Sequence, residues 1–211
     1  MTNFNLKCIH PLSLVPIKMN DIILIIYPGT GLECLFAVNQ IGYNGMIIAS
    51  DTSFNNLKKI QKMCYKYDNI YLILQNINCL PFFNNSFNLI LYYANKNNIF
   101  EKRKIINQVY EKIKKNGYFI ISDVVTKIDF NEKIINEIIN TDDIISLDNY
   151  ISMLEAVKFK NIKINARLSL SDNLISSLMP SNTIEKKEQE WHSKRKDIYK
   201  NIEICFITAI K

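Results

Sequence analysis

The segment that most constrains the fold is an unbroken apolar run, 22–26, that leads through Tyr27-Pro28 into Gly29 and Gly31. An apolar run of this kind is typical of a strand buried on both faces of a parallel sheet, and the glycines let the backbone pass close to a ligand. Further along, a second strand pattern ends on Asp51. In nucleotide-binding α/β folds the acid at that place accepts hydrogen bonds from ribose hydroxyls. The spacing predicts a strand-turn-helix-strand unit for an adenosine-type ligand.

The same features also have a purely structural interpretation. A Gly-x-Gly turn can follow the first strand of any doubly wound fold, so Gly29 and Gly31 alone do not identify a ligand. Asp51 is equally suited to be the N-cap of the helix predicted over 52–67. Both interpretations stay open at this point.

Strand-like and helical patterns alternate along nearly the whole chain, which predicts an α/β fold. Because crossover segments connect the early strands, we expect a mostly parallel sheet. The strands are predicted at 22–27, 46–50, 70–74, 87–93, 118–125, 162–166 and 202–210. The helices are predicted at 35–41, 52–67, 99–115, 132–140 and 147–159. We expect one domain, 1–211, with a core at 20–126 and substrate-side elements and final strands at 127–211.

Composition excludes several classes of protein. Of the 211 residues, 48% are hydrophobic and 22% charged, which suffices for one sizeable core. The formal charge is +6, but the bases are mixed with acids, so no nucleic-acid partner is expected. The apolar runs are too short for a membrane helix, and residues 1–20 lack the layout of a signal peptide. We expect a cytoplasmic protein with no membrane partner.

The cysteines argue against two further classes. They are odd in number and form no CxxC pair, which is unlike a disulfide scaffold or a zinc ribbon. They are Cys8, Cys34, Cys64, Cys79 and Cys205. His10 and His192 have no partner at ligand spacing, so no metal site is expected. Burial in an apolar core is the common fate of such cysteines.

The order of the segments, with three motifs, resembles class I S-adenosylmethionine-dependent methyltransferases, and within them the arsenite methyltransferases. The motifs are the turn 29–34, the loop Leu80-Pro81-Phe82 and the strand ending Ser122-Asp123. Residues 6–11 also resemble the family's Leu-Gly-Cys-Gly-x-Pro segment. The resemblance implies a Rossmann-like fold with a mostly parallel seven-stranded sheet flanked by helices.

The resemblance also implies a set of site residues. The cofactor would be S-adenosylmethionine, held by Gly29, Thr30, Gly31, Asp51, Thr52, Asn76 and Ile77. The methyl acceptor would be a small molecule, a soft nucleophile such as trivalent arsenic on thiolates, because a soft metalloid prefers sulfur ligands. Cys8 and Cys34 fall on two cysteine positions of the family and are the candidate catalytic residues. The next such position is Asp142 here.

The chain departs from the family in its cofactor motif. Ile25 stands where an acid is usual, and Tyr27-Pro28 replaces small residues. These changes predict a lower affinity for the cofactor or an altered pose. Two hypotheses follow. The first is an active methyltransferase that works mainly by positioning its reactants. The second is a catalytically inactive descendant that binds a protein partner. A nucleotide-linked oxidoreductase is disfavoured, because Cys34 takes the place of the third glycine.

Overall fold

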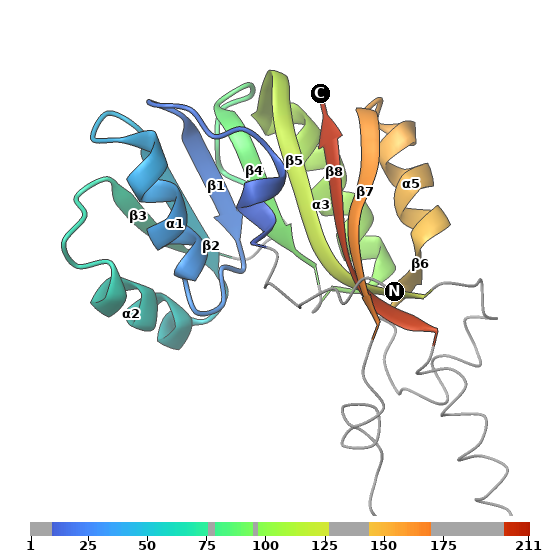
Figure 1. Ribbon diagram of the computed structural model, residues 1–211, viewed down its shortest axis with the longest axis horizontal. Coiled ribbons are helices and arrows are strands. Elements are labelled where there is room, and N and C mark those ends of the chain that lie inside the picture. Colours follow the sequence, from blue (N-terminus) through green and yellow to red (C-terminus); the bar gives the residue numbers. More distant parts are fainter. Residues whose placement is uncertain (1–9, 76–78, 95–96, 127–143, 170–200) are drawn as a thin grey trace, which may run out of the picture.

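The computed structural model describes residues 10–75, 79–94, 97–126, 144–169 and 201–211 (Figure 1). Within these residues eight strands form one sheet, in the order β3-β2-β1-β4-β5-β8-β7, with β6 beside β5. The strands are β1 (Ile22–Ile26), β2 (Met46–Asp51), β3 (Ile70–Leu74), β4 (Phe87–Tyr93), β5 (Ile113–Thr126), β6 (Ile145–Ser146), β7 (Lys160–Ser169) and β8 (Ile202–Ile210). The helices are η1 (Pro11–Leu14), α1 (Leu32–Ile41), α2 (Phe54–Met63), α3 (Ile99–Lys112) and α5 (Leu147–Ala156).

The pairing of the strands confirms the predicted fold class. Strands β1 to β6 pair in parallel wherever they are neighbours, and β8 runs antiparallel to both β5 and β7. The sheet is therefore mostly parallel, and its main path matches the seven predicted strands. The two-residue β6 is an addition, because a segment so short carries no readable period.

Two apolar cores lie on opposite faces of the sheet. Helices α1 and α2 cover one face together with η1, and α3 and α5 cover the other (Figure 1). Strand β1 contributes side chains to both cores. Ile23 and Ile25 belong to the core under α1 and α2, and Leu24 and Ile26 belong to the core under α3 and α5. This placement explains why the β1 segment is apolar without alternation.

The boundary between α3 and β5 differs from the prediction. The helix was expected to reach residue 115, but α3 ends at Lys112, and Ile113 is fully buried with extended backbone. The Asn116-Gly117 pair lies inside β5, where Asn116 has φ +63°, and does not end the helix. Helices α2 and α5 also end earlier than predicted, at Met63 and Ala156. The helix predicted over 132–140 lies outside the described residues.

The loop that carries the Leu80-Pro81-Phe82 motif connects β3 to β4. The Leu80 amide donates to Gln108 Oε1 on α3 at 2.6 Å, and the Leu80 side chain is buried in the core. Phe82 packs edge-on against Phe87, with ring centroids 5.1 Å apart. The motif therefore holds this loop against α3, through the hydrogen bond to Gln108, and against the start of β4, through the ring contact with Phe87.

None of the helices in the described ranges combines the length and the apolar character that crossing a membrane requires.

Candidate cofactor-binding site

The turn after β1 has an unusual backbone. Tyr27, Gly29 and Gly31 all have left-handed φ angles, of 58°, 57° and 81°. The Gly31 amide donates to the Pro28 carbonyl at 2.8 Å, which closes the turn directly before α1. A Cβ on Gly31 would lie 2.7 Å from Ile60 Cγ1, whereas a Cβ on Gly29 would meet no described atom within 4 Å. Gly31 therefore allows α1 and α2 to pack closely, and Gly29 keeps space open beside the turn.

Asp51 is the last residue of β2 and is held in one orientation. Its Oδ1 accepts a hydrogen bond from the Ser53 amide at 2.8 Å, and its Oδ2 accepts one from Asn56 Nδ2 at 3.1 Å. Ser53, not Asp51, is the N-cap of α2, since its hydroxyl accepts from the Asn56 amide. A carboxylate accepts about four hydrogen bonds, so Asp51 keeps capacity for a ligand hydroxyl.

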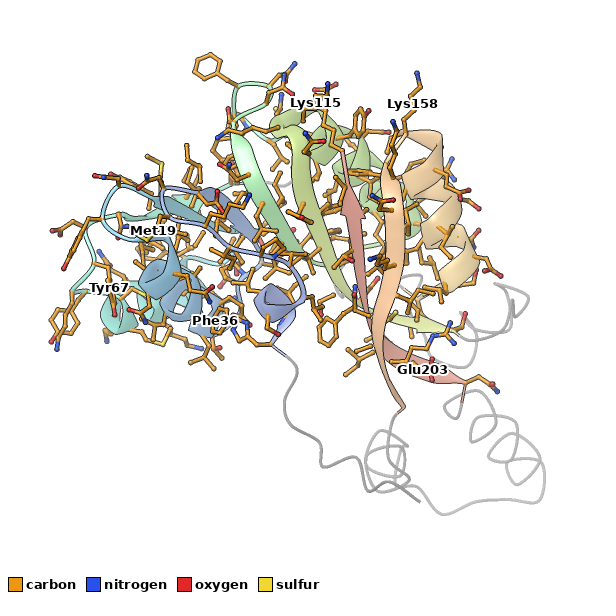
Figure 2. The ribbon with its side chains drawn as sticks, turned by 45° about the horizontal axis from the view of Figure 1, so that its top comes forward. Met19, Phe36, Tyr67, Lys115, Lys158 and Glu203 are labelled. Carbon is orange, nitrogen blue, oxygen red and sulfur yellow. The ribbon has the colours of Figure 1, made fainter. Side chains whose placement is uncertain are left out.

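A cleft of about 290 Å³ lies between the turn and the start of α2. It is lined by Tyr27, Pro28, Gly29, Thr30, Glu33, Asp51, Thr52, Ser53, Asn56 and Tyr93. The cleft lies at the carboxyl ends of the parallel strands, the end of the sheet where Figure 2 shows Glu203, with Lys115 at the opposite end. This is the edge at which open α/β sheets bind ligands.

The cleft brings together part of the predicted cofactor set. Gly29, Thr30, Asp51 and Thr52 line it, and Gly31, which is not among the lining residues, closes the adjoining turn. The other two predicted residues, Asn76 and Ile77, lie outside the described residues.

Gln75 directly precedes those two positions. Its amide donates to the Asp51 carbonyl at 3.1 Å, and both polar atoms of its side chain are buried without a hydrogen-bond partner among the described groups. A buried amide of this kind is expected to have a partner, which a bound ligand can supply.

Two further residues of the cleft, Glu33 and Tyr93, come from distant parts of the chain and contact each other. The Tyr93 hydroxyl donates to Glu33 Oε1 at 2.5 Å, which joins the end of β4 to the first turn of α1. Burial and the neighbouring Glu33 carboxylate raise the pKa of Tyr93, so the hydroxyl stays a donor. The two residues are 60 positions apart, and no local pattern connects them. The one local signal for Glu33 is that residues 29–34 resemble the family's Gly-x-Gly-x-Asp-Cys turn, in which an acid precedes the cysteine.

Cys34, the first candidate catalytic residue, is fully buried in the core beneath α1. Burial, reinforced by Cys64 and Glu33, raises its pKa to about 12, so the thiol is protonated at neutral pH. Thiolates, not thiols, bind metalloids and attack electrophiles, and this environment is typical of packing. Its catalytic role stays a prediction from the resemblance. Cys8, the second candidate, lies outside the described residues.

The remaining described cysteines do not converge on the cleft. Cys64 and Cys205 are buried in the two different cores, and Cys79 is exposed. In the ranges that the structure describes, no three His, Cys, Asp or Glu side chains form a group that could hold a metal ion. His10 stacks on Phe36 of α1, with ring centroids 4.0 Å apart, and burial lowers its pKa (Figure 2 labels Phe36).

The departures from the family motif have structural explanations. Ile25 is fully buried between Ala49 and Leu91 on the neighbouring strands, within the core under α1. Tyr27 is half-buried against the opposite core, and its hydroxyl is hydrogen-bonded to Asn97. Its effect on the cofactor pose stays a prediction.

A second polar cluster lies at the same end of the sheet, under α3. Lys102 Nζ is 2.6 Å from Asp123 Oδ2, and the Tyr150 hydroxyl donates to that same oxygen. Nearby, the Tyr92 hydroxyl donates to Asn97 Oδ1 at 2.8 Å. All five side chains are buried. Sequence reasoning missed the cluster because a lysine on a helix is usually solvated.

Comparison with known proteins places this architecture in a class. The family model for the methyltransferase domain matches residues 26–202. The chain therefore belongs to this methyltransferase family, which confirms the resemblance seen in the sequence.

One curated relative is the arsenite methyltransferase of Halobacterium salinarum, which is 25% identical over 134 residues. The match covers 63% of this chain but 34% of that protein, so the chain spans about a third of the relative's length.

Solved structures share the fold. A putative sarcosine dimethylglycine methyltransferase from Galdieria sulphuraria superposes with a TM-score of 0.71 at 15% identity, covering 95% of this chain and 82% of that one. Phosphoethanolamine N-methyltransferase 2 of Haemonchus contortus, solved in complex with S-adenosyl-L-methionine, has a TM-score of 0.70 at 16% identity, covering 95% and 52%.

Proposed function

We propose that this chain is an S-adenosylmethionine-dependent methyltransferase that seats its cofactor in the cleft beside the Gly29–Gly31 turn. The observation that carries the proposal is the oriented Asp51 carboxylate facing that turn across one cleft. Membership of the methyltransferase family supports the choice of cofactor. When bound, S-adenosylmethionine supplies an activated methyl group on a sulfonium sulfur.

The residues of the cleft fit such a ligand. Asp51 has acceptor capacity for ribose hydroxyls, and the open space beside Gly29 accommodates a ligand that approaches the backbone. Gln75 is not among the lining residues, but its backbone amide contacts Asp51 and its buried side-chain amide has no described partner, so we propose it as a further donor and acceptor for the adenine end. Asn76 and Ile77 keep the cofactor-binding role that the resemblance implies for them.

The protein's part in catalysis would be positioning. A sulfonium methyl needs an aligned nucleophile and a water-poor site more than an acid or a base. Tyr27, Pro28 and Tyr93 line the cleft, and we expect their bulky side chains to help exclude water when the cofactor is bound. No general base is required for an acceptor whose lone pair is already available.

For the acceptor we propose a small, soft nucleophile, such as arsenite already carried by thiols. The Halobacterium relative and the family resemblance support this class. Cys34 is buried and protonated, so an acceptor that brings its own sulfur ligands fits this chain better than one captured by Cys34. Cys8 is the remaining candidate ligand from the chain.

The alternative is a catalytically inactive methyltransferase fold that binds a protein partner. One observation favours it. Large aromatic side chains are exposed near the β3 edge of the sheet, with Tyr43, Tyr65 and Tyr71 exposed by 100%, 73% and 49%. Exposed apolar groups gathered at one place can mark an interaction surface.

The deciding experiment is a calorimetric titration of the reduced protein with S-adenosylmethionine and S-adenosylhomocysteine. Affinity in the micromolar range supports the enzyme and leads to a methyl-transfer assay with arsenite and small thiols. The absence of binding at millimolar ligand overturns the proposal and favours the inactive alternative.

A further inference from the structure

The charged side chains that line the cleft are all acidic. Its described lining includes two carboxylates, Glu33 and Asp51, and no Lys, Arg or His side chain. The two acids come from different elements, Glu33 from the first turn of α1 and Asp51 from the end of β2. A concave site of one sign attracts a ligand of the other sign or one that presents hydrogen-bond donors.

Glu33 is fixed where it lies. The hydrogen bond from the Tyr93 hydroxyl holds its Oε1, and the carboxylate keeps acceptor capacity after this one bond. The amide dipoles of the first turn of α1 also stabilise a negative charge at this position. A pre-oriented carboxylate loses little freedom when a cation binds.

The titratable groups around Glu33 do not cancel its charge. His10 is electrostatically coupled to it, and burial lowers the pKa of that imidazole, which is therefore neutral at pH 7. Tyr93 and Cys34 are the other coupled groups, and both have raised pKa values and are protonated and neutral. None of these three groups therefore places a compensating positive charge beside Glu33.

The turn itself provides no other acid at this end of the cleft. Ile25, where the family has an acid, is buried in the core. We propose that Glu33, oriented by Tyr93, is the specificity-determining carboxylate that receives the ammonium group of the cofactor's amino-acid end. This assignment rests on the proposed function, with Asp51 at the ribose end of the same ligand.

A purely structural role for the pair has to be separated from this one. The Tyr93–Glu33 hydrogen bond also ties α1 to β4, so its loss alone would lower stability. Glu33→Gln separates the two roles, because the amide oxygen can still accept from Tyr93 while the negative charge is gone. Tyr93→Phe is the complementary variant, since it removes the hydrogen bond and keeps the charge.

The test compares three ligands by calorimetry: S-adenosylmethionine, S-adenosylhomocysteine and 5′-methylthioadenosine. The first two carry the ammonium group, and the third has the adenosine and thioether parts without it. We expect Glu33→Gln to weaken binding of the first two by about tenfold or more and to leave methylthioadenosine unchanged. Asp51→Asn should weaken all three, and Tyr93→Phe should cause a smaller, ammonium-dependent loss.

The outcomes distinguish this inference from the proposed function. If the unmodified protein binds none of the ligands, the proposed function fails and the inference with it. If the protein binds all three and Glu33→Gln weakens them equally or not at all, the function stands and the assignment of Glu33 is overturned. Thermal unfolding checks that each variant folds, and Glu33→Ala, which also removes the charge, replaces Glu33→Gln should the latter not fold, with Tyr93→Phe as the control for the lost hydrogen bond.

Discussion

Lys102 Nζ lies 2.6 Å from Asp123 Oδ2, and both side chains are sealed from solvent, with 0% and 2% of their surfaces exposed. The pair joins α3 to the end of β5, and Tyr150 of α5 donates to the same carboxylate oxygen. Three elements of one face of the sheet therefore meet at a single buried charge pair.

Removing one member of this pair should destabilise the protein strongly. In Lys102→Met the Asp123 carboxylate stays buried without its cation, which costs about 3–5 kcal/mol. Urea unfolding followed by circular dichroism measures the loss. Lys104→Met on the exposed side of α3 is the matched control and should change stability by less than about 0.5 kcal/mol. Equal effects of the two variants would contradict the importance of the pair.

The two glycines of the turn should respond differently to alanine. Both have left-handed φ angles, so each substitution should cost about 1–2 kcal/mol of backbone strain. Only at Gly31 does the new Cβ collide with Ile60, at 2.7 Å, which should add about 1–3 kcal/mol. Denaturant unfolding of Gly29→Ala and Gly31→Ala tests this difference, and a larger loss in Gly29→Ala would refute it.

Asp51→Ala should weaken the binding of S-adenosylhomocysteine. Loss of a charged hydrogen bond to the ribose costs about 1.5–3 kcal/mol, or roughly tenfold to a hundredfold in affinity. Calorimetry gives the dissociation constant directly. Asp68→Ala removes an exposed acid outside the cleft and should leave the affinity unchanged. Equal affinities of the unmodified protein and Asp51→Ala would remove Asp51 from the site.

The buried Cys34 thiol should make stability fall in alkaline solution. Its pKa is raised to about 12 in the folded protein, against 9.0 for an ordinary thiol. The unfolded chain therefore releases the proton first, and the contribution of the neutral thiol, complete below pH 9, is lost as the pH rises towards 12. Free energies of unfolding of Cys34→Ala should fall less steeply over this range.

Cys79→Ala is the control for that measurement, because Cys79 is exposed. This variant should keep the slope of the unmodified protein. An identical slope in Cys34→Ala and in the unmodified protein would show that Cys34 ionises with little penalty in the folded state.

Much of the architecture was readable from the sequence because burial imposes its own pattern. Ile22–Ile26 had to be apolar throughout because its residues alternate between two cores, and this pattern correctly predicted a central parallel strand. The end of β2 on Asp51 was likewise visible from spacing. Such signals lie within short segments of the sequence, so they can be recognised without knowledge of the fold.

Other features depend on contacts between distant parts of the chain. The Tyr93–Glu33 hydrogen bond joins residues 60 positions apart, and Lys102 reads as an ordinary surface residue of an amphipathic helix until Asp123 is placed beside it. The early end of α3 follows from the burial of Ile113 in β5, which overrides the helical period of the segment. These features come from packing, which the sequence does not display locally.

The position of β8 has a consequence for how the chain reaches this structure. Residues 202–210 fill the space between β5 and β7, so β5 stays an open edge until a segment more than 70 residues further along has been synthesised. Pairings between such distant segments form slowly, and an unpaired apolar edge is prone to associate with other chains. During synthesis, the β5 edge should therefore be open to wrong pairing until β8 has been made.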